Sequence, residues 1–203
     1  MNPDELRLEK AQLRRHFRQL RQCLPAEQRR AEAEALAARL APWISGQLEA
    51  GARIGLYYPL SDELDPRPLL AALGPCYRYY LPRVEADGGL AFSPYDPGCG
   101  LEEQGYRQTP RGLWEASGRI MEEPELDLLL LPCLAVDRQG RRLGQGAGCY
   151  DRYLQAHTAR GPRPLCLALI LSCQLSVEKL PTGPWDQNLD GWVSAREFYW
   201  ARG

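Results

Sequence analysis

The sequence predicts an α/β protein with a single open, mostly parallel, Rossmann-like sheet, helices on both faces and two helices before the first strand. Short apolar runs alternate with helical patterns along the 203 residues. Residues 126–131 are apolar on both alternating faces, which is typical of a central strand buried from both sides. No repeat or linker divides the chain, so we expect one domain spanning residues 1–203.

Two helices are expected at the amino-terminal end. Residues 4–24 place leucine and phenylalanine side chains at helical spacing, and basic residues fill the other faces. After Pro25, the alanine-rich stretch 26–40 resumes a helical pattern, because alanine has the highest helix propensity.

The rest of the chain alternates between strands and helices. A strand at 53–58, a helix at 66–73 and a strand at 77–81 form a βαβ unit, which predicts a parallel pair. The central strand is followed by a helix at 148–158, a strand at 165–171 and an edge strand at 192–195. Between 88 and 118 only residues 90–95 have a strand pattern.

Composition and charge exclude several classes of function. The 25 basic and 26 acidic residues give a net charge of −1, which provides no overall field for binding a nucleic acid. The amino terminus lacks an apolar signal segment, and no apolar run approaches membrane-spanning length. The seven cysteines contain no Cys-x-x-Cys pair, which favours reduced thiols. We therefore expect a cytoplasmic monomer that binds small molecules and neither nucleic acid nor membrane.

The segment after the presumed central strand carries the strongest chemical pattern. It enters a helix through Gly144, Gly146 and Gly148, at the end of the sheet where ligands bind in open α/β folds. Alternating glycines let backbone N–H groups cradle a phosphate at a helix amino terminus. Arg142 adds a charged donor and Asp151 a candidate Mg²⁺ ligand. The alternative interpretation is an ordinary flexible loop.

This segment resembles the signature of the 5-formyltetrahydrofolate cyclo-ligase family, also called methenyltetrahydrofolate synthetases. The signature has the form Asp-x-x-Gly-x-Arg-Leu-Gly-x-Gly-x-Gly-x-Tyr-Asp, and the matching residues are Asp137, Gly140, Arg142, Leu143, Gly144, Gly146, Gly148, Tyr150 and Asp151. The resemblance implies an ATP- and Mg²⁺-dependent ligase. Such an enzyme cyclises 5-formyltetrahydrofolate to 5,10-methenyltetrahydrofolate through a phosphorylated formyl intermediate, releasing ADP and phosphate.

The resemblance also implies the roles of individual residues. ATP would contact Lys10, Arg14, Arg142, Leu143, Gly144, Gln145, Gly146, Ala147, Gly148, Cys149 and Tyr150. The catalytic residues would be Lys10, Arg14, Arg142 and Tyr150; Tyr58, Glu63 and Tyr150 would bind the folate, and Asp151 and Asp186 would hold Mg²⁺. From spacing alone, a pair of cations such as that at 10 and 14 is more often a solvated helix face. The Ser and Asp residues within 61–65 could equally be simple helix caps.

Two other functions remain open at this point. A kinase or hydrolase of a small metabolite could use the same glycine segment. Residues 186–197 match the pattern of an EF-hand loop, with Asp186, Asn188, Asp190, Gly191 and Glu197 in the required positions. An EF-hand needs a helix on each side, however, and Pro181 and Pro184 disfavour the first of these.

Overall fold

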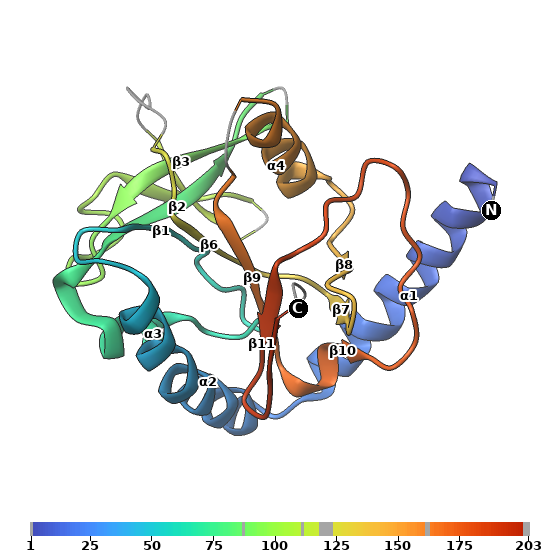
Figure 1. Ribbon diagram of the computed structural model, residues 1–203, viewed down its shortest axis with the longest axis horizontal. Helices are drawn as coiled ribbons and strands as arrows, with labels where there is room; N and C mark the ends of the chain where they lie inside the picture. Colours follow the sequence, from blue (N-terminus) through green and yellow to red (C-terminus); the bar gives the residue numbers. More distant parts are fainter. Residues whose placement is uncertain (1, 87, 111, 118–123, 161–162, 201–203) are drawn as a thin grey trace.

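The computed structural model describes residues 2–86, 88–110, 112–117, 124–160 and 163–200. Its main sheet has seven strands in the order β12-β11-β9-β6-β1-β2-β3 (Figure 1). They are β1 (Arg53–Gly55), β2 (Arg78–Val84), β3 (Leu90–Tyr95), β6 (Leu128–Leu131), β9 (Leu165–Leu169), β11 (Gly191–Val193) and β12 (Phe198–Trp200). Strands β11, β9, β6, β1 and β2 run parallel, and β12 and β3 are antiparallel at the edges. The predicted mostly parallel α/β fold is confirmed.

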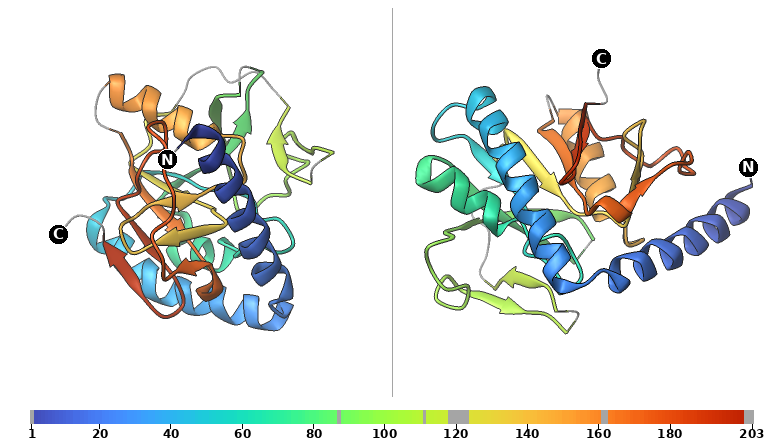
Figure 2. Two further views of the ribbon diagram at one scale, coloured as in Figure 1. Left: turned by 90° about the vertical axis from the view of Figure 1, so that its right-hand side faces the viewer. Right: turned by 90° about the horizontal axis from the view of Figure 1, so that it is seen from below.

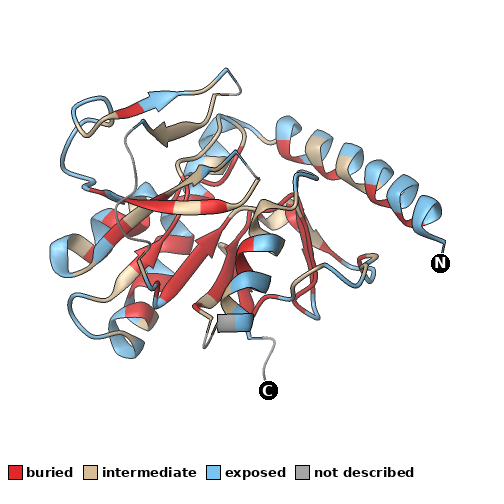
Figure 3. Cartoon of the chain, turned by 90° about the horizontal axis from the view of Figure 1, so that it is seen from above, coloured by how far each residue is buried: buried red, intermediate tan, exposed pale blue. Residues whose placement is uncertain are grey.

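Helices cover both faces of this sheet. The described residues form α1 (Pro3–Cys23), α2 (Ala26–Gln47), α3 (Arg67–Leu73) and α4 (Cys149–Arg160), with short 3₁₀ turns η1 (Gly74–Cys76) and η2 (Ser172–Gln174). Leu128 and Leu130 of β6 share a core cluster with residues of α2 and α3. Leu129 and Leu131 share the opposite cluster with residues of α4. The strand is therefore buried from both sides, as its apolar pattern predicts (Figure 3).

The first helix packs beside the main sheet. Phe17 of α1 joins a small core with Ala135 and Leu143 of the three-stranded sheet β10-β7-β8 and with Leu134 and Leu180 beside it. Its strands are β7 (Ala135–Asp137), β8 (Arg142–Leu143) and β10 (Leu175–Ser176). The amino-terminal end of α1 projects from the body (Figure 2). Asn2 caps it by accepting the Asp4 N–H at 3.1 Å, and Glu5 accepts the Asn2 N–H at 3.0 Å. In the described residues, no helix combines the length and apolar character needed to cross a membrane.

Several predicted boundaries differ from the observed ones because tertiary contacts set them. Helix α2 continues past residue 40 and through Pro42, since Ile44 beyond the proline is fully buried in the core. The strand predicted at 53–58 ends at Gly55. The segment between 88 and 118, which has little readable pattern, contains a hairpin of β4 (Tyr106–Gln108) and β5 (Trp114–Ala116).

The edge strand predicted at 192–195 is wrong in its position. Strand β11 lies inside the sheet, between β9 and β12, and β12 forms the edge. Phe198 of β12 contacts Trp43 of α2 edge-on, with ring centroids 5.1 Å apart. This aromatic contact joins sequence-distant segments, so local periodicity does not predict it.

The EF-hand alternative fails on the contacts of Asp190. Its carboxylate accepts hydrogen bonds from Arg163 at 3.0 Å and from the Cys166 N–H at 2.9 Å, and the next residue, Gly191, begins β11. The residues that the structure describes contain no group of three or more His, Cys, Asp or Glu side chains able to hold a metal ion. The Asp190 carboxylate thus links the start of β11 to the neighbouring strand β9.

Replacing Asp190 with alanine is expected to lower the free energy of unfolding by about 3 kcal/mol, because the Arg163 guanidinium and a buried N–H lose their partner. Asp190→Asn, which keeps one acceptor, should lose less. Urea unfolding of the three proteins, with and without Ca²⁺, measures both points. A calcium-dependent rise in wild-type stability that disappears in Asp190→Ala would contradict this assignment and restore the EF-hand interpretation.

Candidate active site

A cavity of about 990 Å³ opens between α1, the glycine loop before α4, the segment after β1 and the β4–β5 hairpin. Every residue predicted for the site lines this cavity. These residues are Lys10, Arg14, Tyr58, Glu63, Arg142, Leu143, Gly144, Gln145, Gly146, Ala147, Gly148, Cys149, Tyr150, Asp151 and Asp186. Segments that are far apart in the sequence thus meet at one concave surface.

Helix α1 presents cations to the glycine loop. Lys10 is buried and forms an ion pair with Asp186, which also accepts the Gly183 N–H at 2.6 Å. One turn later, Arg14 Nε donates to the Gly144 carbonyl at 2.9 Å. Partial burial lowers the pKa of Arg14, although the nearby Asp186 carboxylate opposes this shift. The spacing of four residues therefore places both cations on the cavity side of the helix.

Two of the three glycines in the glycine loop adopt a backbone conformation that favours glycine. Gly146 and Gly148 have φ values of +111° and +70°, in the left-handed region that favours glycine. A Cβ atom on Gly146 would lie 3.5 Å from the guanidinium carbon of Arg14. The missing side chain thus leaves the loop backbone open to the cavity close to a cation.

Arg142 lies behind this loop with an unused donor. Its Nη2 donates to Asp151 Oδ1 at 2.7 Å, and its guanidinium carbon is 5.9 Å from the centroid of the Tyr150 ring. Its Nε is buried and has no hydrogen-bond partner among the residues that the structure describes. Buried donors are nearly always paired, so this atom fits an acceptor supplied by a ligand. We refer to Lys10, Arg14, Arg142 and residues 144–148 as the basic end of the cavity.

Two carboxylates lie at the basic end. Asp151 Oδ1 accepts hydrogen bonds from Arg142 and from the Gln187 N–H at 3.0 Å, and Asp186 Oδ2 accepts from Lys10 and Gly183. Within the described part of the chain, the second oxygen of each carboxylate has no hydrogen-bond donor. Mg²⁺ commonly binds one or two carboxylates, water and substrate phosphates, so these two residues fit such an ion.

The opposite end of the cavity is aromatic and contains a buried carboxylate. The Tyr58 and Trp114 rings meet edge-on with centroids 6.2 Å apart. Glu63 is 9% exposed and accepts the Leu60 N–H at 3.1 Å and the Arg21 guanidinium at 3.3 Å. Burial raises the pKa of Glu63, and the Leu60 N–H and Arg21 oppose this shift. We refer to Tyr58, Glu63 and Trp114 as the aromatic end.

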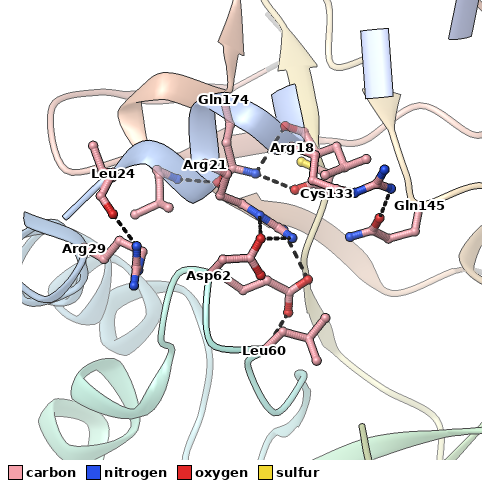
Figure 4. Close-up of polar contacts among 12 residues, drawn as sticks. Arg18, Arg21, Leu24, Arg29, Leu60, Asp62, Cys133, Gln145 and Gln174 are labelled. Atoms are coloured by element: carbon pink, nitrogen blue, oxygen red, sulfur yellow. Dashed lines mark hydrogen bonds and ion pairs between the residues drawn. The ribbon is translucent and has the colours of Figure 1, made fainter. Parts of the chain in front are cut away.

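The cavity lining also includes residues that the sequence did not predict, and Arg18, Arg21 and Trp114 are among them. Arg18 donates to Gln145 Oε1 at 2.9 Å (Figure 4), and its position one turn after Arg14 is a signal that could have identified it. Arg21 continues the same face of α1. Trp114 comes from the hairpin whose sequence has no readable period, so no local signal marks it.

Known proteins resemble this chain over nearly its whole length. A family model described as the 5-formyltetrahydrofolate cyclo-ligase family matches residues 7–194. The chain belongs to this family. The match includes both ends of the cavity and confirms the resemblance of the glycine segment to the cyclo-ligase signature. It also confirms the prediction that the protein is an enzyme of the ligase class.

Individual cyclo-ligases align over similar lengths. The 5-formyltetrahydrofolate cyclo-ligase of Mycolicibacterium smegmatis is 33% identical over 183 residues, covering 87% of this chain and 89% of the relative. That of Escherichia coli K12 is 31% identical over 173 residues, covering 84% and 91%. The NMR structure of Aquifex aeolicus 5,10-methenyltetrahydrofolate synthetase has a TM-score of 0.75 at 26% identity, covering 96% of this chain and 93% of that one. The cyclo-ligase likeness therefore extends from sequence to fold.

The backbone of the glycine loop gives a direct test of the basic end. Gly146→Ala should lower the free energy of unfolding by about 1–2 kcal/mol, because alanine is strained at positive φ. It should also weaken the thermal stabilisation given by inorganic tripolyphosphate. Gly46→Ala is the matched control, since that glycine is in α2 with no atom within 4 Å of an added Cβ. It should stabilise the protein by up to about 1 kcal/mol and leave the tripolyphosphate effect unchanged. Equal effects of the two substitutions would contradict this view of the loop.

Proposed function

We propose that this protein catalyses the Mg²⁺- and ATP-dependent cyclisation of 5-formyltetrahydrofolate to 5,10-methenyltetrahydrofolate, with release of ADP and phosphate. The observation that carries the proposal is that one cavity joins a basic end suited to a triphosphate with an aromatic end suited to a flat heterocycle. Membership of the cyclo-ligase family supports the reaction class.

The reaction requires the formyl oxygen to leave as part of phosphate. Transfer of the γ-phosphoryl group to that oxygen converts a poor leaving group into a good one and releases ADP. The neighbouring folate nitrogen then attacks the formyl carbon, which closes the five-membered ring. Loss of phosphate from that carbon, together with the proton of the attacking nitrogen, leaves the methenyl product. Phosphoryl transfer depends mainly on positioning and on stabilisation of charge, so no residue needs to be covalently modified.

The basic end supplies the positioning for ATP. Lys10, Arg14 and Arg142 would bind the phosphates, with the Arg142 Nε donor free to bond a phosphate oxygen. The remaining ATP contacts would come from Leu143 and the loop from Gly144 to Cys149, with Tyr150 between the two ends of the cavity. Mg²⁺, held by Asp151 and Asp186 together with water, would neutralise the phosphate oxygens.

The aromatic end supplies the positioning for the folate. The pterin ring presents an amino group and a ring N–H side by side, and a carboxylate can accept both hydrogen bonds. Glu63 is the buried carboxylate at that end, and Tyr58 forms part of the adjacent wall. Tyr150 interacts with Glu63 of this end and with Arg142 of the basic end.

We also propose that residues 1–203 act as one domain, as a monomer, in the cytoplasm. All seven cysteines are free, which suits a reducing compartment. Light scattering of the purified protein tests whether it is a monomer, and fractionation of cells tests whether it is cytoplasmic.

The two lysines of the chain offer a matched test of ATP binding. Lys10→Met should lower kcat/KM for ATP by about 10- to 100-fold, because a charged hydrogen bond to phosphate is lost. Lys179→Met is the control, since Lys179 is exposed and lies outside the cavity lining. The appearance of methenyltetrahydrofolate absorbance measures the rate. No product from the intact protein with Mg-ATP would refute the proposed reaction, and ATP hydrolysis without folate would instead favour a hydrolase.

Glu63→Gln tests the folate end independently. The amide keeps one acceptor but loses the charge and replaces the second acceptor with a donor. The KM for 5-formyltetrahydrofolate should rise by about 10-fold or more, while the KM for ATP changes little. An equal rise in both KM values would show that Glu63 does not act selectively on the folate.

A further inference from the structure

Arg21 is a buried cation that none of the roles above uses. It lies on α1, is 2% exposed, and lines the aromatic end of the cavity. Its guanidinium contacts Asp62 Oδ2 through Nε at 3.0 Å and Nη2 at 2.9 Å, and Glu63 Oε1 through Nη1 at 3.3 Å. Figure 4 shows this group between α1 and the loop after β1. One guanidinium thus serves two adjacent carboxylates.

The contacts of Glu63 fix its orientation. Oε1 faces Arg21 and Oε2 accepts the Leu60 N–H, so each oxygen has one donor and the carboxylate plane is held. Each carboxylate oxygen has about two lone-pair sites, so both retain acceptor capacity for a ligand. A substrate with two adjacent donors would therefore meet a carboxylate that is already oriented.

The charge state of Glu63 depends on the same contacts. Burial favours the neutral acid, the Leu60 N–H and then Arg21 favour the carboxylate, and the neighbouring charge of Asp62 opposes ionisation. The other titratable groups that face Glu63 are Tyr57, Cys133 and Tyr150, from three further segments. Burial raises the pKa of both tyrosines and raises that of Cys133 to about 12, so all three are neutral near pH 7. Arg21 and Asp62 are the charged groups that decide the balance.

We propose that Arg21 is a positioning residue for the folate, which holds Glu63 ionised and oriented, while Asp62 moderates this effect by sharing the guanidinium. This role rests on the proposed function. This role gives α1 two separate tasks, binding ATP and positioning the folate. Lys10 and Arg21 are eleven residues apart, or roughly 16 Å along the helix axis. The amino-terminal part of α1 serves the basic end of the cavity, and its last turn serves the aromatic end.

The test is direct binding of 5-formyltetrahydrofolate, without ATP, by calorimetry across a range of pH. Protonation of Glu63 should weaken binding at acid pH, and the midpoint of that loss reports on its ionisation. Arg21→Met should weaken binding at neutral pH by about 10-fold and move the midpoint to higher pH, because the cation that favours the carboxylate is gone. Arg21→Lys, which keeps the charge, should restore the midpoint while binding more weakly than the wild type.

Asp62→Asn gives the decisive comparison because its expected shift has the opposite sign. Removing the neighbouring negative charge should move the midpoint to lower pH, although this variant also disturbs a contact of Arg21. If the Arg21–Asp62 pair has only a structural role, Arg21→Met and Asp62→Asn should both weaken binding without moving the pH midpoint in opposite directions. Glu63→Gln should abolish the acid-dependent loss, and adding Arg21→Met to it should not restore it.

The control for an arginine-to-methionine change is Arg30→Met. The Arg30 side chain is 75% exposed on α2 and pairs only loosely with Glu34, at 3.7 Å. It should bind the folate as the wild type does, and thermal unfolding verifies that each variant is folded. If Arg21→Met does not fold, the lysine and asparagine variants still give the two predicted midpoints.

The outcomes separate the two proposals. Absence of binding to the intact protein would overturn the proposed function and this role with it. If the intact protein binds the folate and Asp62→Asn, Arg21→Lys and Arg21→Met all have the same pH midpoint as the wild type, only the role of Arg21 would be overturned. Opposite shifts in the methionine and asparagine variants would support both.

Discussion

The arrangement of the site depends on one buried carboxylate, that of Asp137. Its Oδ1 accepts the N–H groups of Gln139 and Arg141 at 2.8 and 3.1 Å, and its Oδ2 accepts Arg141 Nε at 2.7 Å and the Leu180 N–H at 2.9 Å. Four donors satisfy a charge that would otherwise be costly to bury. These bonds tie the turn before the glycine loop to the segment that leads to Asp186. Asp137 therefore holds in place both the turn that leads into the glycine loop and the segment that leads to Asp186. This signature residue acts on ligands only through those two segments.

The placement of α1 is the second requirement, and polar contacts contribute much of it. Its carboxy-terminal half packs through Phe17, and Leu6 is buried nearer the amino-terminal end, the tip of which projects from the body (Figure 2). Lys10 reaches Asp186, Arg14 reaches the glycine loop, and Arg21 reaches the loop after β1. Because the same side chains both attach the helix and line the cavity, we expect binding at the cavity to be coupled to the docking of α1.

Local patterns were sufficient for the parts of the molecule that depend on local physics. The leucine run of β6 predicted burial on both faces, and the alternating glycines permit the positive φ angles observed at 146 and 148. The family signature supplied the residues around them. The contacts of Arg21 with the loop after β1 were not predictable, because a charge pair between segments 41 residues apart leaves no periodic trace. The β4–β5 hairpin, which contributes Trp114, was missed for a similar reason: tertiary contacts stabilise its short strands.

Although the chain as a whole is nearly neutral, the cavity contains cations that form ion pairs with acidic side chains. Lys10 pairs with Asp186, and Arg142 with Asp151. Such pairs hold long side chains in the cavity before a ligand arrives, which reduces the conformational entropy lost on binding. These ion pairs also have a consequence for ligand binding. If a cation leaves its carboxylate to bind a phosphate, the carboxylate loses its counter-charge. Under the proposed function, Asp151 and Asp186 would hold Mg²⁺ that binds with ATP, and the ion would compensate their charge once the cations bind phosphate.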